Sequence, residues 1–182
     1  MSPSNLISSI FLLSLIISNI AAISSTSLIE TACSNPRLVG PNTLSCIQTL
    51  KAQPDVVSAK NTFELAIAIM KAGISSAIET GKHIDKLLGG PHVGPELQSC
   101  KTSYDDVVKA IKSALEEVKD DKEFDTATYD LLIGCTDTFQ PCLEAAGKIN
   151  DPIISNGNNA MLIYGLSAYQ AIDSLADTSA GS

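Results

Sequence analysis

Apolar residues recur every three or four positions in four long stretches of the chain. At about 3.6 residues per turn, this spacing puts each apolar set on one face of an α-helix. The four stretches are residues 56–88, 97–118, 125–146 and 161–175. Asp55 is a suitable N-cap for the first helix, and Pro141 predicts a kink in the third. Because no stretch alternates apolar and polar residues as a half-buried strand would, the sequence predicts an all-α protein.

Short breaks separate these helices. They are Gly89-Gly90-Pro91, the charged turn at residues 120–123, and residues 147–155 with their Asp151-Pro152 pair. Helices joined by short links pack antiparallel, so we expect an up-down-up-down four-helix bundle over residues 55–176. The preceding segment, residues 26–54, is interrupted by Pro36 and Gly40-Pro41. We interpret it as a short N-terminal helical hairpin attached to the bundle.

Residues 1–25 have the features of a secretory signal peptide. Leu6 to Ile17 form an apolar run interrupted only by serines, and this run is shorter than the about 20 residues that a membrane span needs. Small residues follow at Ala21-Ala22 and Ser24-Ser25, as a signal-peptidase site requires. We therefore expect cleavage between residues 22 and 27, leaving a secreted domain of residues 26–182. The alternative is an uncleaved N-terminal anchor.

The chain is acidic, with a net charge of -8, and this limits the classes of partner. Nucleic acids and anionic lipid surfaces are bound by clustered Lys and Arg, so neither is an expected partner. After removal of the leader we expect no membrane association. An excess of negative charge instead keeps a protein soluble and attracts a basic partner.

Five cysteines lie in the predicted mature chain: Cys33, Cys46, Cys100, Cys135 and Cys142. In the secretory pathway disulfides are the default. Cys33 and Cys46 would lock the hairpin, while Cys100 and Cys142 would meet where the second and third helices are neighbours. Cys135 lies about two turns, roughly 10 Å, back along the third helix, too far from Cys100 for a bond. We expect Cys135 to be a buried free thiol; the alternative is a reactive or intermolecular thiol.

No arrangement of catalytic or metal-binding residues stands out. The nearest sequence to a nucleophile elbow, Gly73 to Ala77, lies in the middle of a predicted helix. Adjacent acidic pairs such as Asp105-Asp106 point about 100° apart on a helix and do not converge. His83 and His92 lie far from any cysteine pair, which argues against zinc. The sequence predicts no catalytic residue, no metal and no cofactor.

In their order and spacing, the cysteines and helix starts resemble the plant invertase and pectin methylesterase inhibitor family. The resemblance is carried by Leu28 to Cys33 with Cys46, by Phe63 to Ile69, by Leu97 to Tyr104, and by Cys142. There are also departures from the family pattern. The spacing between the first two cysteines is longer than usual, Cys135 replaces the usual Ala, and the aromatic residue after the fourth cysteine is missing. The link at residues 153–159 lacks the usual lysines.

The resemblance implies a secreted all-α protein that inhibits a plant cell-wall carbohydrate enzyme one-to-one, in the apoplast or in the vacuole. The family's pectin methylesterase inhibitors look like plugs, in which one face of the bundle covers the enzyme's substrate cleft. Its invertase inhibitors insert a Pro-Lys-Phe loop between the last helices, where this chain has Gly147-Lys148-Ile149. We therefore expect pectin methylesterase as the partner. Acid invertase is the alternative target, and a secreted helical carrier, storage or defence protein is the second alternative.

If the protein is an inhibitor, we expect its enzyme contacts to come from exposed polar side chains on the second to fourth helices. The candidate contact residues are Asp106, Lys109, Glu116, Thr136 and Thr138. The two threonines lie near the predicted Cys100–Cys142 bond, which should be the stiffest part of the bundle. Each of these side chains is also of a type that an ordinary solvated surface carries.

Overall fold

A computed structural model of the protein describes residues 27–36, 42–90 and 94–180, so the predicted signal peptide and His92 lie outside the described residues. All regular elements in the described part of the chain are helical, with no strand, which confirms the all-α prediction. They are a helical segment at residues 27–32, then α2 (Asn42–Lys51), α3 (Pro54–Val57), α4 (Thr62–Leu88), α5 (Pro95–Glu116), η2 (Glu117–Asp121), α6 (Phe124–Leu132), η3 (Ile133–Asp137), α7 (Gln140–Ile149) and α8 (Pro152–Ala180). The two η elements are π-helical.

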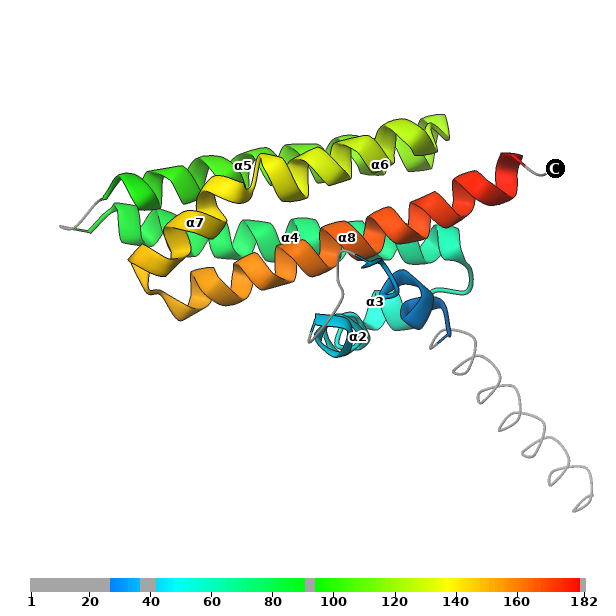
Figure 1. Ribbon diagram of the computed structural model, residues 1–182, viewed down its shortest axis with the longest axis horizontal. Coiled ribbons are helices and arrows are strands. Elements are labelled where there is room, and N and C mark those ends of the chain that lie inside the picture. Colours follow the sequence, from blue (N-terminus) through cyan, green and yellow to red (C-terminus); the bar gives the residue numbers. More distant parts are fainter. Residues whose placement is uncertain (1–26, 37–41, 91–93, 181–182) are drawn as a thin grey trace, which may run out of the picture.

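Four helical columns lie side by side and run alternately in opposite directions (Figure 1). The columns are α4, α5, the combined segment α6–η3–α7, and α8. Both α4 and the α6–η3–α7 column pack against α5 and against α8. The arrangement is consistent with the predicted up-down-up-down bundle.

The N-terminal segment packs beside the bundle rather than within it (Figure 1). Contacts from α2 reach α8, and contacts from α3 reach α4. Two polar side chains tie the segment to α8: the Asn35 amide donates to the Leu166 carbonyl (3.3 Å), and the Gln53 amide donates to the Tyr164 hydroxyl (3.0 Å). The described part of the hairpin therefore covers the bundle beside α4 and α8 and leaves the opposite side of the bundle uncovered.

The first bundle helix begins at Thr62, and the predicted start at Asp55 is wrong. Asp55 lies in the separate short helix α3. The N-cap is Asn61, whose side-chain oxygen accepts a 2.9 Å hydrogen bond from the Glu64 N–H. The Glu64 carboxylate accepts in turn from the Lys60 N–H (2.9 Å), a reciprocal arrangement close to a capping box. These local hydrogen bonds outweigh the apolar periodicity in setting the helix start.

The third column bends where Pro141 lies in the first turn of α7, as the sequence predicts (Figure 1). The bend follows the π-helical turn η3, in which the Thr138 N–H donates to the Ile133 carbonyl (2.9 Å). The fourth helix starts earlier than its apolar stripe suggests, at Pro152, because the Asp151 carboxylate accepts from the N–H groups of Ile153 (2.8 Å) and Ile154 (3.0 Å).

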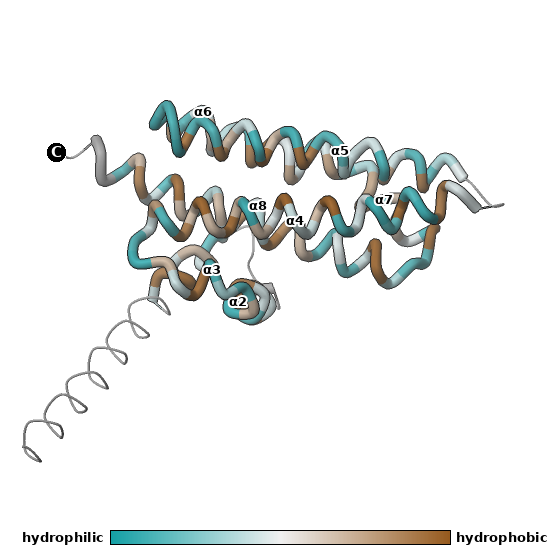
Figure 2. The backbone as a smooth tube through the Cα atoms, turned by 180° about the vertical axis from the view of Figure 1, so that it is seen from behind, coloured by the Kyte–Doolittle hydropathy of each residue, from teal (hydrophilic) through white to brown (hydrophobic). Residues whose placement is uncertain are grey.

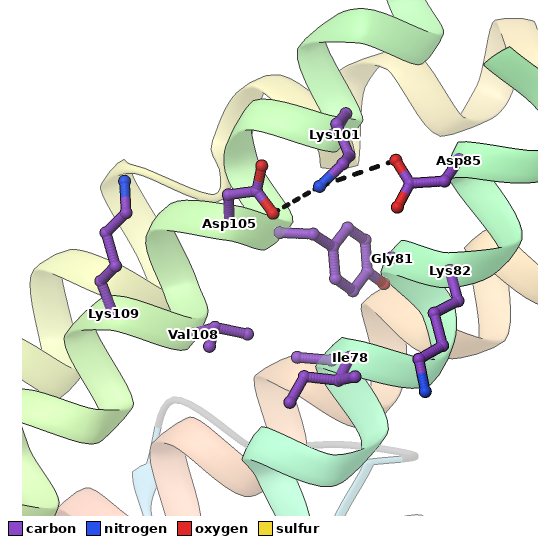
Figure 3. Close-up of a pocket in the computed structure, with 10 residues that line it drawn as sticks. Ile78, Gly81, Lys82, Asp85, Lys101, Asp105, Val108 and Lys109 are labelled. Atoms are coloured by element: carbon purple, nitrogen blue, oxygen red, sulfur yellow. Dashed lines mark hydrogen bonds and ion pairs between the residues drawn. The ribbon is translucent and has the colours of Figure 1, made fainter.

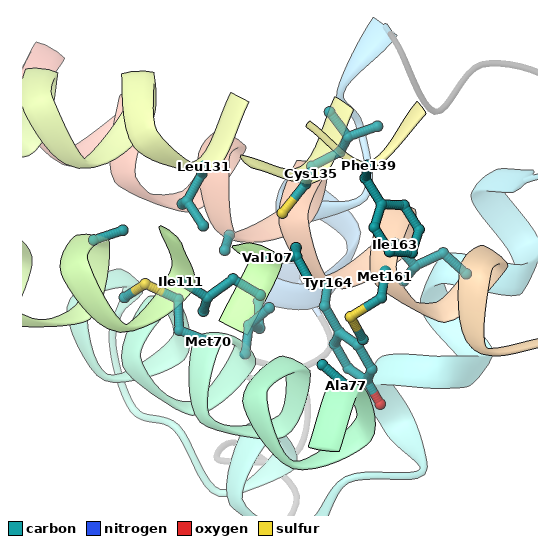
Figure 4. Close-up of a cluster of buried hydrophobic side chains, with 14 of the residues drawn as sticks. Met70, Ala77, Val107, Ile111, Leu131, Cys135, Phe139, Met161, Ile163 and Tyr164 are labelled. Atoms are coloured by element: carbon teal, nitrogen blue, oxygen red, sulfur yellow. The ribbon is translucent and has the colours of Figure 1, made fainter. Parts of the chain in front are cut away.

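Apolar residues recur along every column (Figure 2), and the buried ones form one cluster between the columns (Figure 4). The rings of Tyr104 and Phe139 meet edge to face with their centroids 5.1 Å apart, an arrangement that aromatic rings favour. Tyr104 and Tyr164 lie on the apolar faces predicted for residues 97–118 and 161–175, and both are buried.

Small residues set the distance between the third column and its neighbours. A Cβ added at Gly134 would collide with the Ala110 side chain of α5. A Cβ added at Gly165 of α8 would collide with Cys135. The third column can therefore sit this close to α5 and α8 only because two glycines leave the space open.

We expect Gly134→Ala to destabilise the fold by about 1–3 kcal/mol, because the new methyl group has no room beside Ala110. Gly147→Ala is the matched control. Gly147 is an exposed residue in α7 whose Cβ would meet nothing within 4 Å, so this change should stabilise by up to about 1 kcal/mol. Chemical denaturation measures both, and equal effects would contradict the close contact.

Candidate functional site

Two disulfides fix the elements that could present a binding surface. Cys33 is bonded to Cys46 (Cα–Cα 5.8 Å), and Cys100 of α5 is bonded to Cys142 of α7 (Cα–Cα 4.3 Å). These are the two pairs that the sequence analysis expects, and all four residues are buried. The second bond clamps the start of α5 to the third column.

Cys135 is a free, fully buried cysteine, and its side chain lies among the apolar residues of the core (Figure 4). Burial raises the pKa of its thiol to about 12. A thiol that stays protonated and has no access to solvent is a poor nucleophile. This environment favours a packing role for Cys135 over a reactive one.

The five candidate contact residues lie on two neighbouring columns. Asp106 and Lys109 form an exposed ion pair on α5 (2.8 Å), and Glu116 is the exposed last residue of that helix. Thr136 lies in η3, and Thr138 is the first residue after η3. The structure therefore brings Asp106 and Lys109 together and places the threonines on the adjacent column, with Glu116 about 10 Å farther along α5 than Lys109.

Two contacts join these columns beneath the candidate residues. The Ser103 hydroxyl of α5 donates to the Thr138 carbonyl (3.2 Å), and Gly134 packs closely against Ala110. The Thr136 hydroxyl is itself held by the Leu132 carbonyl (2.5 Å). The backbone under this surface, which we call the α5–η3 face, is thus fixed by packing and hydrogen bonds. A fixed face suits recognition of a rigid partner.

A shallow groove of about 400 Å³ lies between α4 and α5 (Figure 3). Its apolar lining comes from Ala77, Ile78 and Gly81 of α4 and from Tyr104 and Val108 of α5. We call it the α4–α5 groove. The sequence does not predict this groove, because periodicity shows which face of a helix is apolar and not where two helix faces leave a gap.

Charged side chains form the edge of this groove. Lys101 bridges the two helices, with its Nζ 3.7 Å from the Asp85 carboxylate of α4 and 2.5 Å from the Asp105 carboxylate of its own helix (Figure 3). The hydrogen bond that the Lys101 ammonium donates to the Asp105 carboxylate raises the pKa of Lys101. Lys82 and Lys109 also line the groove. The groove is therefore lined by three lysines and two aspartates, with Lys82 and Lys109 on opposite sides of it (Figure 3).

A hydrogen-bonded pair that the sequence does not predict lies at the end of the bundle. The half-buried His83 of α4 has its Nε2 2.9 Å from the Asp151 carboxylate. Partial burial favours the neutral acid, but the hydrogen bond with His83 and those from the Ile154 and Ile153 N–H groups outweigh it. The pKa of Asp151 is therefore lowered. No local signal could have paired residues 68 positions apart.

The geometry defines a disulfide-bonded helical protein with a preorganised polar face. Among the described residues no cluster of His, Cys, Asp and Glu could hold a metal ion, and none of the described helices is both long and apolar enough to span a membrane. The family model for plant invertase/pectin methylesterase inhibitors matches residues 27–161. Comparison with curated proteins and with solved structures found no significant match.

The chain therefore belongs to the plant invertase/pectin methylesterase inhibitor family. Members of this family are typically secreted, and they are inhibitors of pectin methylesterase or of invertase rather than enzymes. The family assignment supports inhibition as the class of function.

We expect Cys142→Ala to cost about 2–5 kcal/mol of folding stability, because it removes the bond that closes the loop from Cys100. Cys135→Ala is the control: it removes a buried sulfur without breaking a bond and should cost no more than about 1 kcal/mol. Denaturant titration measures both. Peptide mapping under non-reducing conditions that found a Cys100–Cys135 linkage would contradict the assigned pairing.

We expect Asp151→Ala to destabilise the fold by about 1–2 kcal/mol, because it removes both the cap of α8 and the partner of His83. Asp151→Asn keeps a capping oxygen and should cost less. Because folding lowers the pKa of Asp151, its carboxylate stabilises the fold above its unfolded pKa, and this contribution is lost as pH falls through the folded pKa. The stability difference between wild type and Asp151→Asn should therefore shrink in acid. A pH-independent difference would contradict the pairing.

Proposed function

We propose that this protein is a secreted inhibitor of plant pectin methylesterase that covers the enzyme's substrate cleft in a one-to-one complex. The observation that carries the proposal is the family match over residues 27–161, which supports inhibition of either pectin methylesterase or invertase. The α5–η3 face supplies the contact surface.

The link between α7 and α8 favours pectin methylesterase over invertase. Only Asn150 and Asp151 separate these helices. Gly147-Lys148-Ile149, which stands in place of the Pro-Lys-Phe sequence, is the last turn of α7, and Lys148 pairs with Glu96 of α5 (3.6 Å). A link of two residues, capped by Asp151, is too short to reach into an enzyme cleft. The inserted Pro-Lys-Phe loop of the family's invertase inhibitors therefore has no counterpart between α7 and α8.

The α5–η3 face suits binding by surface complementarity. Its helices are held by the Cys100–Cys142 bond and by the Ser103 to Thr138 hydrogen bond, so little conformational entropy is lost on docking. Its five candidate side chains are polar: Lys109 and Glu116 are exposed, and Asp106, Thr136 and Thr138 are half-buried. Polar, partly accessible side chains are expected at the rim of a protein–protein interface. The net charge of -8 should speed the encounter with a basic enzyme.

Packing of the core favours an inhibitor over a carrier of apolar ligands. A carrier needs a continuous apolar cavity, whereas the described apolar side chains between the columns pack into one buried cluster (Figure 4). The hollows at α4–α5, α6–α8, α3–α4 and the end of α7 each include charged side chains in their lining. These hollows belong to the surface.

Titration calorimetry against a plant pectin methylesterase and a plant acid invertase tests the proposal. At mildly acidic pH we expect binding to pectin methylesterase with one-to-one stoichiometry, recovery of the uncut chain, and no comparable binding to invertase. Raising the salt concentration should slow association, because it screens the attraction between the charged partners. Binding to invertase alone would overturn the choice of target. Binding to neither, over several isoforms, would overturn the inhibitor function.

The double variant Asp106→Ala/Lys109→Ala tests the contact face. We expect it to weaken binding to pectin methylesterase by about tenfold or more, as truncation of contact side chains commonly does. Lys71→Ala is the control, because Lys71 is an exposed lysine of α4 that lines the hollow beside α3 instead. Equal affinities of the two variants and the wild type would exclude the α5 part of the face.

A further inference from the structure

Gly81 is a buried glycine in the interior of α4 for which the fold itself gives no packing reason. The other buried helical glycines each lie against a neighbour that a Cβ would meet: Gly73 against Tyr164 (3.1 Å), Gly157 against Thr80 and Tyr104 (2.6 Å each), Gly165 against Cys135. At Gly81 a Cβ would meet nothing within 4 Å. A glycine inside a helix is destabilising relative to alanine, and one of its uses is close approach of another molecule to the backbone.

The space left by Gly81 opens into the α4–α5 groove (Figure 3). Tyr104 lines the inner side of the groove, and its hydroxyl donates to the Asn158 side chain of α8 (2.9 Å). Behind it, Gly157 packs tightly against Thr80 and Tyr104, so the groove does not continue into the core. The groove therefore offers room at the surface for a side chain from another protein and does not enclose a ligand within the bundle.

The charges around the groove indicate the charge that a partner residue next to that side chain should carry. The Asp85 and Asp105 carboxylates are both engaged by Lys101. Lys82 makes no ion pair among the described residues, and Lys109 is held only at the exposed carboxylate of Asp106. Lys82 and Lys109 stand on opposite sides of the groove (Figure 3), and a partner's carboxylate beside the groove complements either amine.

We propose that the α4–α5 groove is a second docking subsite of the inhibitor. It receives one apolar side chain of the target enzyme, with an acidic residue beside it that pairs with Lys82 or Lys109. The subsite rests on the proposed inhibitory function and extends the contact surface from the α5–η3 face across α5 to α4. Ile78, whose side chain is 39% exposed, and Val108 would close around the incoming side chain.

Filling the groove from within tests the subsite. Gly81→Gln adds a side chain where the fold leaves room, so the variant should fold with unchanged or raised stability, and its binding to pectin methylesterase should weaken by about tenfold or more. Gly147→Gln makes the same substitution at an exposed helical glycine of α7 and should bind like wild type. Circular dichroism and thermal unfolding of both variants establish that they are folded.

A second pair of variants tests the charge and does not depend on the glycine. Lys82→Glu should weaken binding by a similar factor, whereas Lys71→Glu, on the same helix but outside the groove, should cause a much smaller change. If the wild type binds pectin methylesterase and both Gly81→Gln and Lys82→Glu bind as tightly, the subsite is excluded while the inhibitory function stands. If the wild type binds neither pectin methylesterase nor invertase, both proposals fail.

Discussion

Contact between small residues brings the third column against its neighbours, and the candidate binding surface depends on that contact. Gly134 lets η3 approach Ala110 of α5, and Gly165 lets α8 approach Cys135. With larger residues the columns would separate, and the hydrogen bond from Ser103 to the Thr138 carbonyl would lengthen beyond its observed 3.2 Å. Close packing at these points, more than the disulfides alone, fixes the relative position of α5 and η3.

A surface held in this way can act on an enzyme without chemistry of its own. The Asp106–Lys109 pair and the two threonines stand on backbone that docking need not reorganise, so the binding free energy is not spent on ordering the inhibitor. The α4–α5 groove adds a different element, a shallow apolar site with lysines at its edge. The polar face would orient the enzyme, and the apolar subsite would supply binding energy. In many interfaces a few buried side chains carry most of the affinity.

Sequence periodicity predicted the helical columns, the bend at Pro141 and the burial of Tyr104 and Tyr164, because each follows from residue spacing along one helix. It failed where local hydrogen bonds set the start of a helix, or where contacts between distant residues set the structure. Asn61, not Asp55, starts the first bundle helix, and the π-helical turns have no periodic signature. Pairing of His83 with Asp151 and the opening of the α4–α5 groove depend on how columns meet in space. The cysteine positions did predict two contacts between distant residues, because a disulfide requires its two residues to lie close together.

Hydrogen–deuterium exchange of the protein, free and bound to pectin methylesterase, tests most directly whether it acts by covering the enzyme with a preformed face. We expect slower exchange on binding in peptides from α5, η3 and the adjoining part of α4, and unchanged exchange in α2 of the hairpin. The bound chain should be recovered uncut. Protection confined to the hairpin, or cleavage of the chain during inhibition, would contradict this mechanism.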